Sequence, residues 1–227
     1  MIRGGVLCVP SRHLALLSGA AYAMTMFDAR VNRAFSPLVE GIAAPMARRG
    51  SSALNVTIGG FVAAVAAIVF ITSGFYLTGY VLLLLNRLAD GVDGAVARRT
   101  EPTPVGEFLD TLLDFVVIAA VPFAFSLAHP ASALAGAFLL LGIVVWAVSE
   151  LSLRLTHGPT DAQTYNTAGH KLPASICGYT ETFIVFGLMC LVPVVFPVLC
   201  YLYGILLFVS VGIRVAGAVM SAENFQR

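Results

Sequence analysis

The chain has 227 residues, of which 59% are hydrophobic and 11% charged, and its mean hydropathy is +0.90. Soluble domains carry roughly 25% charged residues, so this composition excludes a water-soluble globule. The formal net charge of +1 gives no basic footprint for nucleic acid, and the four cysteines form no closely spaced pair of the kind that binds zinc.

Residues 1–50 are predicted to form an N-terminal arm that ends in an amphipathic helix. The apolar stretch His13–Phe27 follows two arginines as in a signal peptide, but no small-residue cleavage site follows it, so we expect it to stay uncleaved. Charged residues then interleave with an apolar series typical of a helix in the membrane interface: Val31, Phe35, Leu38, Ile42 and Met46. An ordinary cytoplasmic arm is the alternative.

Residues 51–227 are predicted to form one all-α membrane domain of six transmembrane helices. Three runs without Asp, Glu, Lys or Arg, each long enough for two helices, cover residues 50–86, 115–149 and 182–213. Helix-breaking residues interrupt each run, at Thr72-Ser73-Gly74, at His129-Pro130 and between Pro193 and Pro197. Three hairpins result, with expected spans at residues 55–73, 76–98, 105–127, 131–153, 172–193 and 198–218.

The basic residues determine the expected orientation of this domain. All thirteen fall on one side of the six-span arrangement, and none falls in the three hairpin turns. The positive-inside rule therefore predicts that both termini lie in the cytoplasm, together with the inner loops, of which the polar segment 155–170 is one.

Charged residues within membrane spans are costly and indicate function, and this chain concentrates them where the second span ends and the third begins. Asp90 and Asp93 share one face of the second helix, and Asp110 and Asp114 are four residues apart on the third. The seven-residue loop 99–105 allows the two faces to meet.

Four aspartates that meet would repel one another unless a cation neutralises them. Oxygen-only ligands favour Mg²⁺ or Mn²⁺, and four carboxylates are enough for two ions. Gly94 and Gly106 allow a phosphate-bearing ligand or the opposing helix to approach closely, and the guanidinium of Arg98, one turn beyond Gly94, suits phosphate oxygens. The alternative is that the aspartates are interfacial helix-end charges paired with Arg87, Arg98 and Arg99. Such ion pairs would not require the aspartates to share one face on each helix, so the alternative does not explain their spacing.

The stretch Asp90–Asp114, DGVDGAVARRTEPTPVGEFLDTLLD, resembles the signature of the CDP-alcohol phosphotransferase family, D-x2-D-G-x2-A-R-x8-G-x3-D-x3-D. All eight signature residues are present in order: Asp90, Asp93, Gly94, Ala97, Arg98, Gly106, Asp110 and Asp114. The chain departs from the usual pattern only in having seven residues between Arg98 and Gly106, which leaves both helical registers intact.

The resemblance implies a role for each matching residue. It implies three metal-binding aspartates: Asp90, Asp93 and Asp110. Asp114 matches the general base and is expected to contact a second metal ion as well. Five further positions match or resemble contacts to the cytidine nucleotide or the donor: Asn55, Thr57, Gly94, Arg98 and Thr103.

The activity that the resemblance implies is phospholipid synthesis in the bacterial cytoplasmic membrane, with the active site at the cytoplasmic face. A phosphatidyl or other substituted phosphate group would move from CDP-diacylglycerol or a related CDP-alcohol to the hydroxyl of a small alcohol, with release of CMP. Mg²⁺ or Mn²⁺ would be the cofactor, two ions being expected, and family members are commonly homodimers.

Basic residues of the fifth and sixth spans suggest how the acceptor is held. Lys171 and Arg214, with Arg154, are predicted to form a cationic pocket for a phosphorylated acceptor such as glycerol phosphate or inositol phosphate. The alternative is that these basic side chains anchor the helix ends by extending to the lipid headgroups. Glu181 is expected to pair with Arg214 or to line the pocket, and Glu150 to pair with Arg154 one turn later.

Two other classes of membrane protein are compatible with intramembrane acids. A cation-coupled transporter would distribute its acids across the bilayer, whereas here they cluster at one edge. A non-catalytic scaffold would not require the intact signature.

Overall fold

The computed structural model describes residues 33, 35–48, 52–100, 103–161, 164–167, 170–173 and 177–225. After a helix over residues 35–48, its elements are α2 (Ala53–Thr72), α3 (Tyr76–Ala97), α4 (Pro104–Ala128), the short 3-10 helix η1 (Pro130–Ser132), α5 (Ala133–Asp161), β1 (Thr164–Thr167), β2 (His170–Pro173), α6 (Tyr179–Leu191), η2 (Pro193–Val195) and α7 (Phe196–Phe225). The predicted uncleaved apolar stretch lies outside the described residues.

The three predicted hairpin breaks are confirmed. The turn between α2 and α3 contains Gly74, whose φ of 86° is in the left-handed region that favours glycine. α4 ends just before Pro130, and α6 ends just before Pro193, because proline has no amide hydrogen with which to continue a helix.

The predicted inner loop at 155–170 is wrong in its bounds and its structure. α5 continues to Asp161, and β1 and β2 then form an antiparallel hairpin in which Asn166 pairs with Lys171. The fifth span, predicted at 172–193, corresponds to α6, which has 13 residues. Polar, glycine-containing segments suit loops, hairpins and helix ends alike, so their composition does not separate these structures.

Four of the described helical segments are long and apolar enough to cross a membrane: Ala53–Thr72, Val105–Ala128, Pro130–Leu153 and Pro193–Ala218. α3 falls outside this set because Arg87, Asp90 and Asp93 lie in its second half, and α6 falls outside it because it is short. The described chain is thus an all-α membrane protein apart from one small hairpin.

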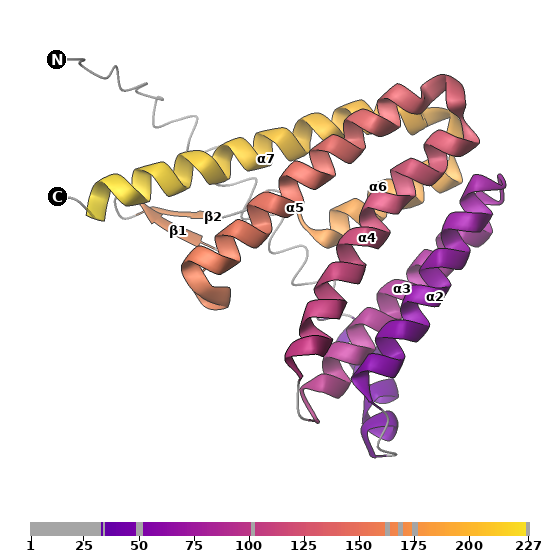
Figure 1. Cartoon of the computed structure of the whole chain (residues 1–227), viewed down its shortest axis with the longest axis horizontal. Coiled ribbons are helices and arrows are strands. Elements are labelled where there is room, and N and C mark those ends of the chain that lie inside the picture. Colours follow the sequence, from indigo (N-terminus) through magenta and orange to yellow (C-terminus); the bar gives the residue numbers. More distant parts are fainter. Residues whose placement is uncertain are drawn as a thin grey trace.

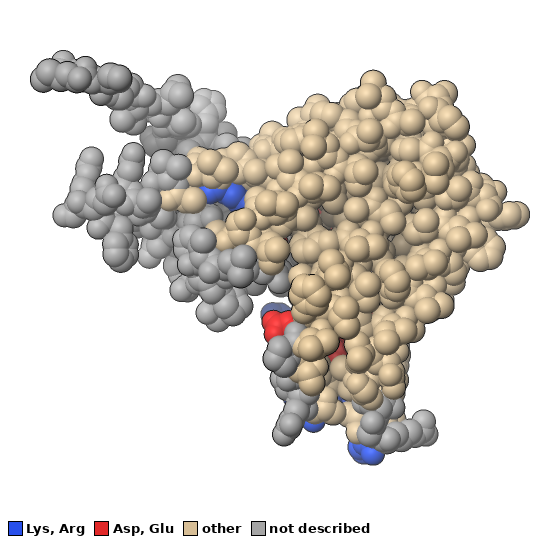
Figure 2. All heavy atoms as spheres, in the orientation of Figure 1, with Lys and Arg blue, Asp and Glu red and all other residues tan. Residues whose placement is uncertain are grey.

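Figure 1 shows α2, α3 and α4 side by side, and α5 and α7 as a second pair that diverges from them. Tyr76 stacks on the buried Phe125, which stacks on the buried Phe196, with ring centroids 5.4 and 5.0 Å apart, and these contacts link α3, α4 and α7 where the two groups join. The acidic signature lies at the opposite end, where the helices spread apart. Figure 2 shows that the visible charged side chains of this face lie toward that spread end.

The helix over residues 35–48 packs across the second half of α3. Val39 faces Gly91, where a Cβ atom would lie 3.2 Å from a Val39 methyl group. An ion pair between Glu40 and Arg99 joins the same two regions at the surface. Residues 35–48 are therefore helical, as predicted, and part of the apolar side of this helix packs on the protein.

Gly60 allows α2 and α3 to lie close together, because a Cβ atom there would be 2.8 Å from the Cβ of Ala89. We expect Gly60→Leu to force the helices apart and to lower the melting temperature in detergent by several degrees, since overpacking costs about 1–3 kcal/mol. The neighbouring Gly59→Leu is the matched control, because a Cβ atom there meets nothing within 4 Å. Equal melting temperatures for the two variants would contradict the close approach.

Candidate active site

The second half of α3 and the first half of α4 bring the predicted aspartates together. Carboxylate oxygens of Asp90, Asp93 and Asp110 all lie within 4.8 Å of one another. Asp114, one turn further along α4, lines the same small pocket and interacts electrostatically with Asp90 and Asp110. The helical spacing thus produces the shared acidic face that the sequence predicts.

Two neighbouring side chains bind carboxylates of this acidic face. Arg87 forms an ion pair with Asp90, one turn later on α3. Thr57 on α2 donates a hydrogen bond of 2.6 Å from its Oγ1 to Oδ2 of Asp93, which is only 3% exposed. The bond replaces part of the hydration that Asp93 loses on burial. Arg87 supplies one positive charge beside four carboxylates.

The donor set fits a divalent cation. Opposite oxygens around one Mg²⁺ are about 4 Å apart, because each lies about 2.0–2.1 Å from the ion. The mutual distances within 4.8 Å among the three aspartates are close to that separation. Carboxylates without nitrogen or sulfur ligands favour Mg²⁺ or Mn²⁺, so small side-chain movements suffice for Asp90, Asp93 and Asp110 to share an ion.

A larger cavity of about 830 Å³ opens beside Asp90. Its polar end includes Gly94 and Arg98, and a Cβ atom at Gly94 would meet only the Arg98 side chain, at 3.5 Å. Apolar side chains from the helix over residues 35–48, from α3 and from α6 line the remainder: Phe35, Leu38, Val81, Leu84, Phe183 and Ile184. One cavity therefore joins a polar end at the acidic face to a long apolar wall.

Two of the residues predicted to contact the nucleotide have other surroundings. Asn55 is exposed and lines a separate hollow between α2 and α3 with Met46 and Leu85. Thr103 caps α4, because its Oγ1 accepts the amide hydrogen of Gly106 at 3.1 Å. A Cβ atom at Gly106 would lie 2.9 Å from that hydroxyl, so the absence of a side chain at Gly106 leaves room for this helix cap.

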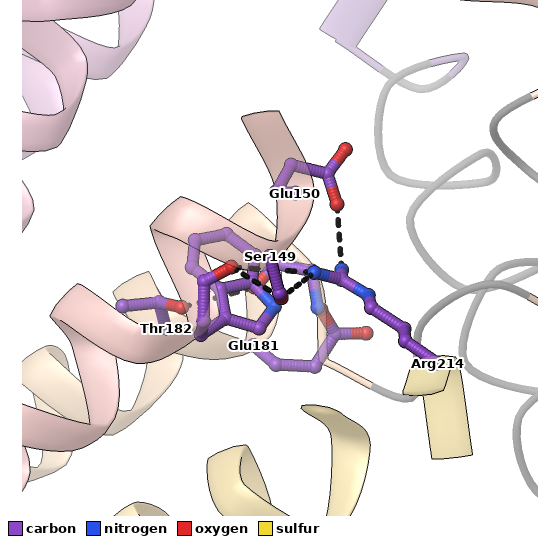
Figure 3. A network of polar contacts seen from close by, with 7 residues as sticks. Ser149, Glu150, Glu181, Thr182 and Arg214 are labelled. Carbon is purple, nitrogen blue, oxygen red and sulfur yellow. Dashed lines mark hydrogen bonds and ion pairs between the residues drawn. The ribbon is translucent and has the colours of Figure 1, made fainter. Parts of the chain in front are cut away.

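Arg214 lies in a second polar cluster, between α5 and α7 (Figure 3). Its guanidinium donates hydrogen bonds to Oε2 of Glu150 at 2.6 Å and to Oγ of Ser149 at 2.7 Å, and it lies 5.6 Å from the ring centroid of Trp146. Glu150 thus pairs with Arg214, which is 64 residues away, while its predicted pairing with Arg154 lies outside the described side chains. Local spacing carries no signal for such a pair.

Two further residues of the predicted acceptor pocket, Glu181 and Lys171, belong to α6 and β2. The Glu181 carboxylate accepts the Gly178 amide hydrogen at 2.9 Å and thereby caps α6. Lys171 lies on β2, opposite Asn166, and only its backbone is described.

Comparison with known proteins adds a family assignment to this geometry. A family model described as CDP-alcohol phosphatidyltransferase matches residues 52–219. An inner membrane protein of Escherichia coli strain K12, YnjF, is 35% identical over 206 residues, which is 89% of this chain and 100% of the relative. An archaetidylinositol phosphate synthase of Methanothermobacter thermautotrophicus is 38% identical over 92 residues, which is 40% of this chain and 44% of the relative.

The acidic face makes a prediction that is independent of activity. Millimolar Mn²⁺ should raise the melting temperature of the purified protein, because an ion that binds only the folded state stabilises it. Asp93→Asn keeps an acceptor for Thr57 but removes one charge, and it should abolish most of this increase. Glu107→Gln, an exposed acid at the start of α4, is the control and should retain it. An identical response of all three proteins would exclude these aspartates as ligands.

Proposed function

The chain belongs to the CDP-alcohol phosphatidyltransferase family, and we propose that it transfers a phosphatidyl group from CDP-diacylglycerol to the hydroxyl of a small alcohol, with release of CMP. The family assignment supports phospholipid synthesis by a transferase. The identity of the donor, the roles of individual residues and the orientation in the membrane are parts of the proposal.

One observation carries the proposal: the acidic face and the cavity of about 830 Å³ meet at Asp90. A CDP-linked lipid requires both environments, because its diphosphate is anionic and its acyl chains are apolar. We assign the diphosphate to the polar end, beside Gly94 and Arg98, and the acyl chains to the wall that includes Leu84 and Phe183. Thr57 supports the site through Asp93.

Three of the aspartates, Asp90, Asp93 and Asp110, would hold the first divalent ion, and Asp114 would contribute to a second. Mg²⁺ or Mn²⁺ bound there would offset the negative charge that develops on the diphosphate oxygens during transfer. Because Asp90 lines the cavity, ions bound by these carboxylates would lie beside the diphosphate of the donor.

Asp114 is the proposed general base. The acceptor oxygen attacks the phosphorus atom that carries the diacylglycerol, and its proton passes to the Asp114 carboxylate. A new oxygen–phosphorus bond forms, the bond from that phosphorus to the CMP phosphate breaks, and CMP leaves with the electron pair. Asp114 is suited to this role because it borders the cluster of three aspartates.

The other nucleotide contacts implied by the resemblance remain part of the proposal. Asn55, at the start of α2, and Thr103, at the start of α4, would contact the nucleotide or the loop around it when the donor is bound. On the acceptor side we assign Lys171 and Arg214, because β2 and the second half of α7 lie at the spread end of the helices (Figure 1).

We further propose six spans, with α3 and α6 completing the four long apolar helices, and both termini in the cytoplasm. The active site would then face the cytoplasm from the bacterial inner membrane, the membrane named for the Escherichia coli relative. Residues 1–50 would form a separate arm and amphipathic helix, residues 51–227 the catalytic domain, and two copies a homodimer.

Release of CMP tests the proposal directly. Purified protein incubated with CDP-diacylglycerol, Mn²⁺ and a panel of small alcohols should release CMP only when a suitable alcohol is present. A transporter or a non-catalytic scaffold would release none with any alcohol.

Replacement of the base makes a second test. Asp114→Asn should lower the rate of CMP release by a factor of about 10²–10⁴, the usual contribution of a general base, while donor binding is retained. Glu107→Gln, two helical turns earlier on α4 and exposed, should keep the wild-type rate. Wild-type CMP release by Asp114→Asn would refute the assignment.

The apolar wall makes a third test. Leu84→Trp would occupy part of the cavity and should raise KM for CDP-diacylglycerol about tenfold, which corresponds to about 1.4 kcal/mol of overpacking. Val65→Trp, on an exposed face of α2, is the control. An unchanged KM in Leu84→Trp would show that the acyl chains bind elsewhere.

A further inference from the structure

Asn86 is a polar residue in the apolar middle of α3, directly after the run Val81–Leu85. It lies one turn before Asp90 and therefore outside the signature, which begins at Asp90. A carboxamide in a membrane helix is costly unless a partner binds it. Within the described part of the chain, the Asn86 side chain forms no hydrogen bond. Its oxygen and nitrogen are therefore available to a ligand.

The Asn86 side chain borders the acidic face. It lines the same small pocket as Asp90, Asp110 and Asp114. This pocket has a volume of about 10 Å³, which is room for about one water molecule. An ion that enters the pocket would therefore lie close to the polar groups that line it.

Asn86 and Asp114 extend the polar faces of their helices in the same direction. α3 and α4 run in opposite directions from the chain segment that joins them (Figure 1). Asn86 lies one turn before Asp90 on α3. Asp114 lies one turn after Asp110 on α4. Both residues are thus on the side of the pocket that is farther from the joining segment.

A carboxamide suits this position because of its charge and its contact with α2. The carbonyl oxygen of asparagine is a ligand for hard divalent ions. Four carboxylates already repel one another in the pocket, and a neutral oxygen adds a ligand without adding repulsion. The carboxamide lies against α2, because a Cβ atom at Gly60 would be 3.5 Å from Nδ2 of Asn86. Rotation about the Cβ–Cγ bond exchanges the two polar atoms, so Oδ1 can face the pocket.

We propose that Oδ1 of Asn86 is a further ligand of the divalent ion to which Asp114 contributes. This inference rests on the divalent ions of the proposed function. The aspartates of the signature supply the negative charge that attracts the ion, and Asn86 adds a neutral oxygen from one turn further along α3. Loss of this oxygen weakens the binding of that ion.

Binding of Mn²⁺ to the purified full-length protein tests the inference without any substrate. Free Mn²⁺ is measured by electron paramagnetic resonance during a titration. Asn86→Leu keeps the approximate size and the charge of the side chain but removes the oxygen, and it should raise the dissociation constant of one Mn²⁺ ion about tenfold. Thr78→Val, a polar-to-apolar change at an exposed position of α3, is the matched control and should bind Mn²⁺ like the wild-type protein.

Two further variants separate the loss of a ligand from a change in packing. Asn86→Asp restores an oxygen and should bind Mn²⁺ at least as tightly as the wild-type protein, whereas binding as weak as that of Asn86→Leu would overturn the inference. If Asn86 only packed α3 against α2, Asn86→Leu would change the melting temperature without Mn²⁺ but keep the wild-type Mn²⁺ affinity, and this result would also overturn it. Should Asn86→Leu not fold, the smaller Asn86→Ala decides by the same measurement.

CMP release by the wild-type preparation distinguishes this inference from the proposed function. Wild-type CMP release together with equal Mn²⁺ affinities of the wild-type protein and Asn86→Leu would overturn the inference alone. Absence of CMP with every alcohol, together with a tenfold weaker affinity in Asn86→Leu, would support Asn86 as a ligand and overturn the proposed transfer.

Discussion

Carboxylates that face one another at the edge of an apolar helix bundle repel, and the residues around them must offset this repulsion. Asp90, Asp93 and Asp110 meet across α3 and α4 with one neighbouring guanidinium, Arg87, so a bound cation would relieve the repulsion among them. The same charge requirement explains why a divalent ion and an anionic diphosphate are suited to this place together. The acidic face thus has the charge and the ligand atoms to hold a divalent cation.

Packing of small residues makes this concentration of charge possible. Gly60 brings α2 against α3, and this approach allows the Thr57 hydroxyl to reach Asp93. Buried Asp93 is then held by a neutral donor, while Asp90, paired with Arg87, lines both the small pocket and the larger cavity. The two aspartates of α3 therefore have different surroundings, because a neutral hydroxyl binds Asp93 and a guanidinium binds Asp90.

The sequence predicts the features that depend on local spacing. Proline and glycine positions gave the hairpin breaks, and the helical period placed Asp90 with Asp93 on one helix face and Asp110 with Asp114 on the next. Contacts between distant helices, such as Glu150 with Arg214, were not predictable because no short-range pattern encodes them. The β-hairpin in the predicted loop was missed for a related reason, since its polar composition fits several local structures.

The helix over residues 35–48 forms one wall of the lipid-sized cavity, whereas the region that matches the family begins at residue 52. Under the proposed function, the catalytic groups and part of the surface assigned to the acyl chains are therefore encoded in separate stretches of the gene. On that assignment, substitutions in one short segment would alter which lipid chains fit the cavity, while the acidic faces of α3 and α4 would stay unchanged.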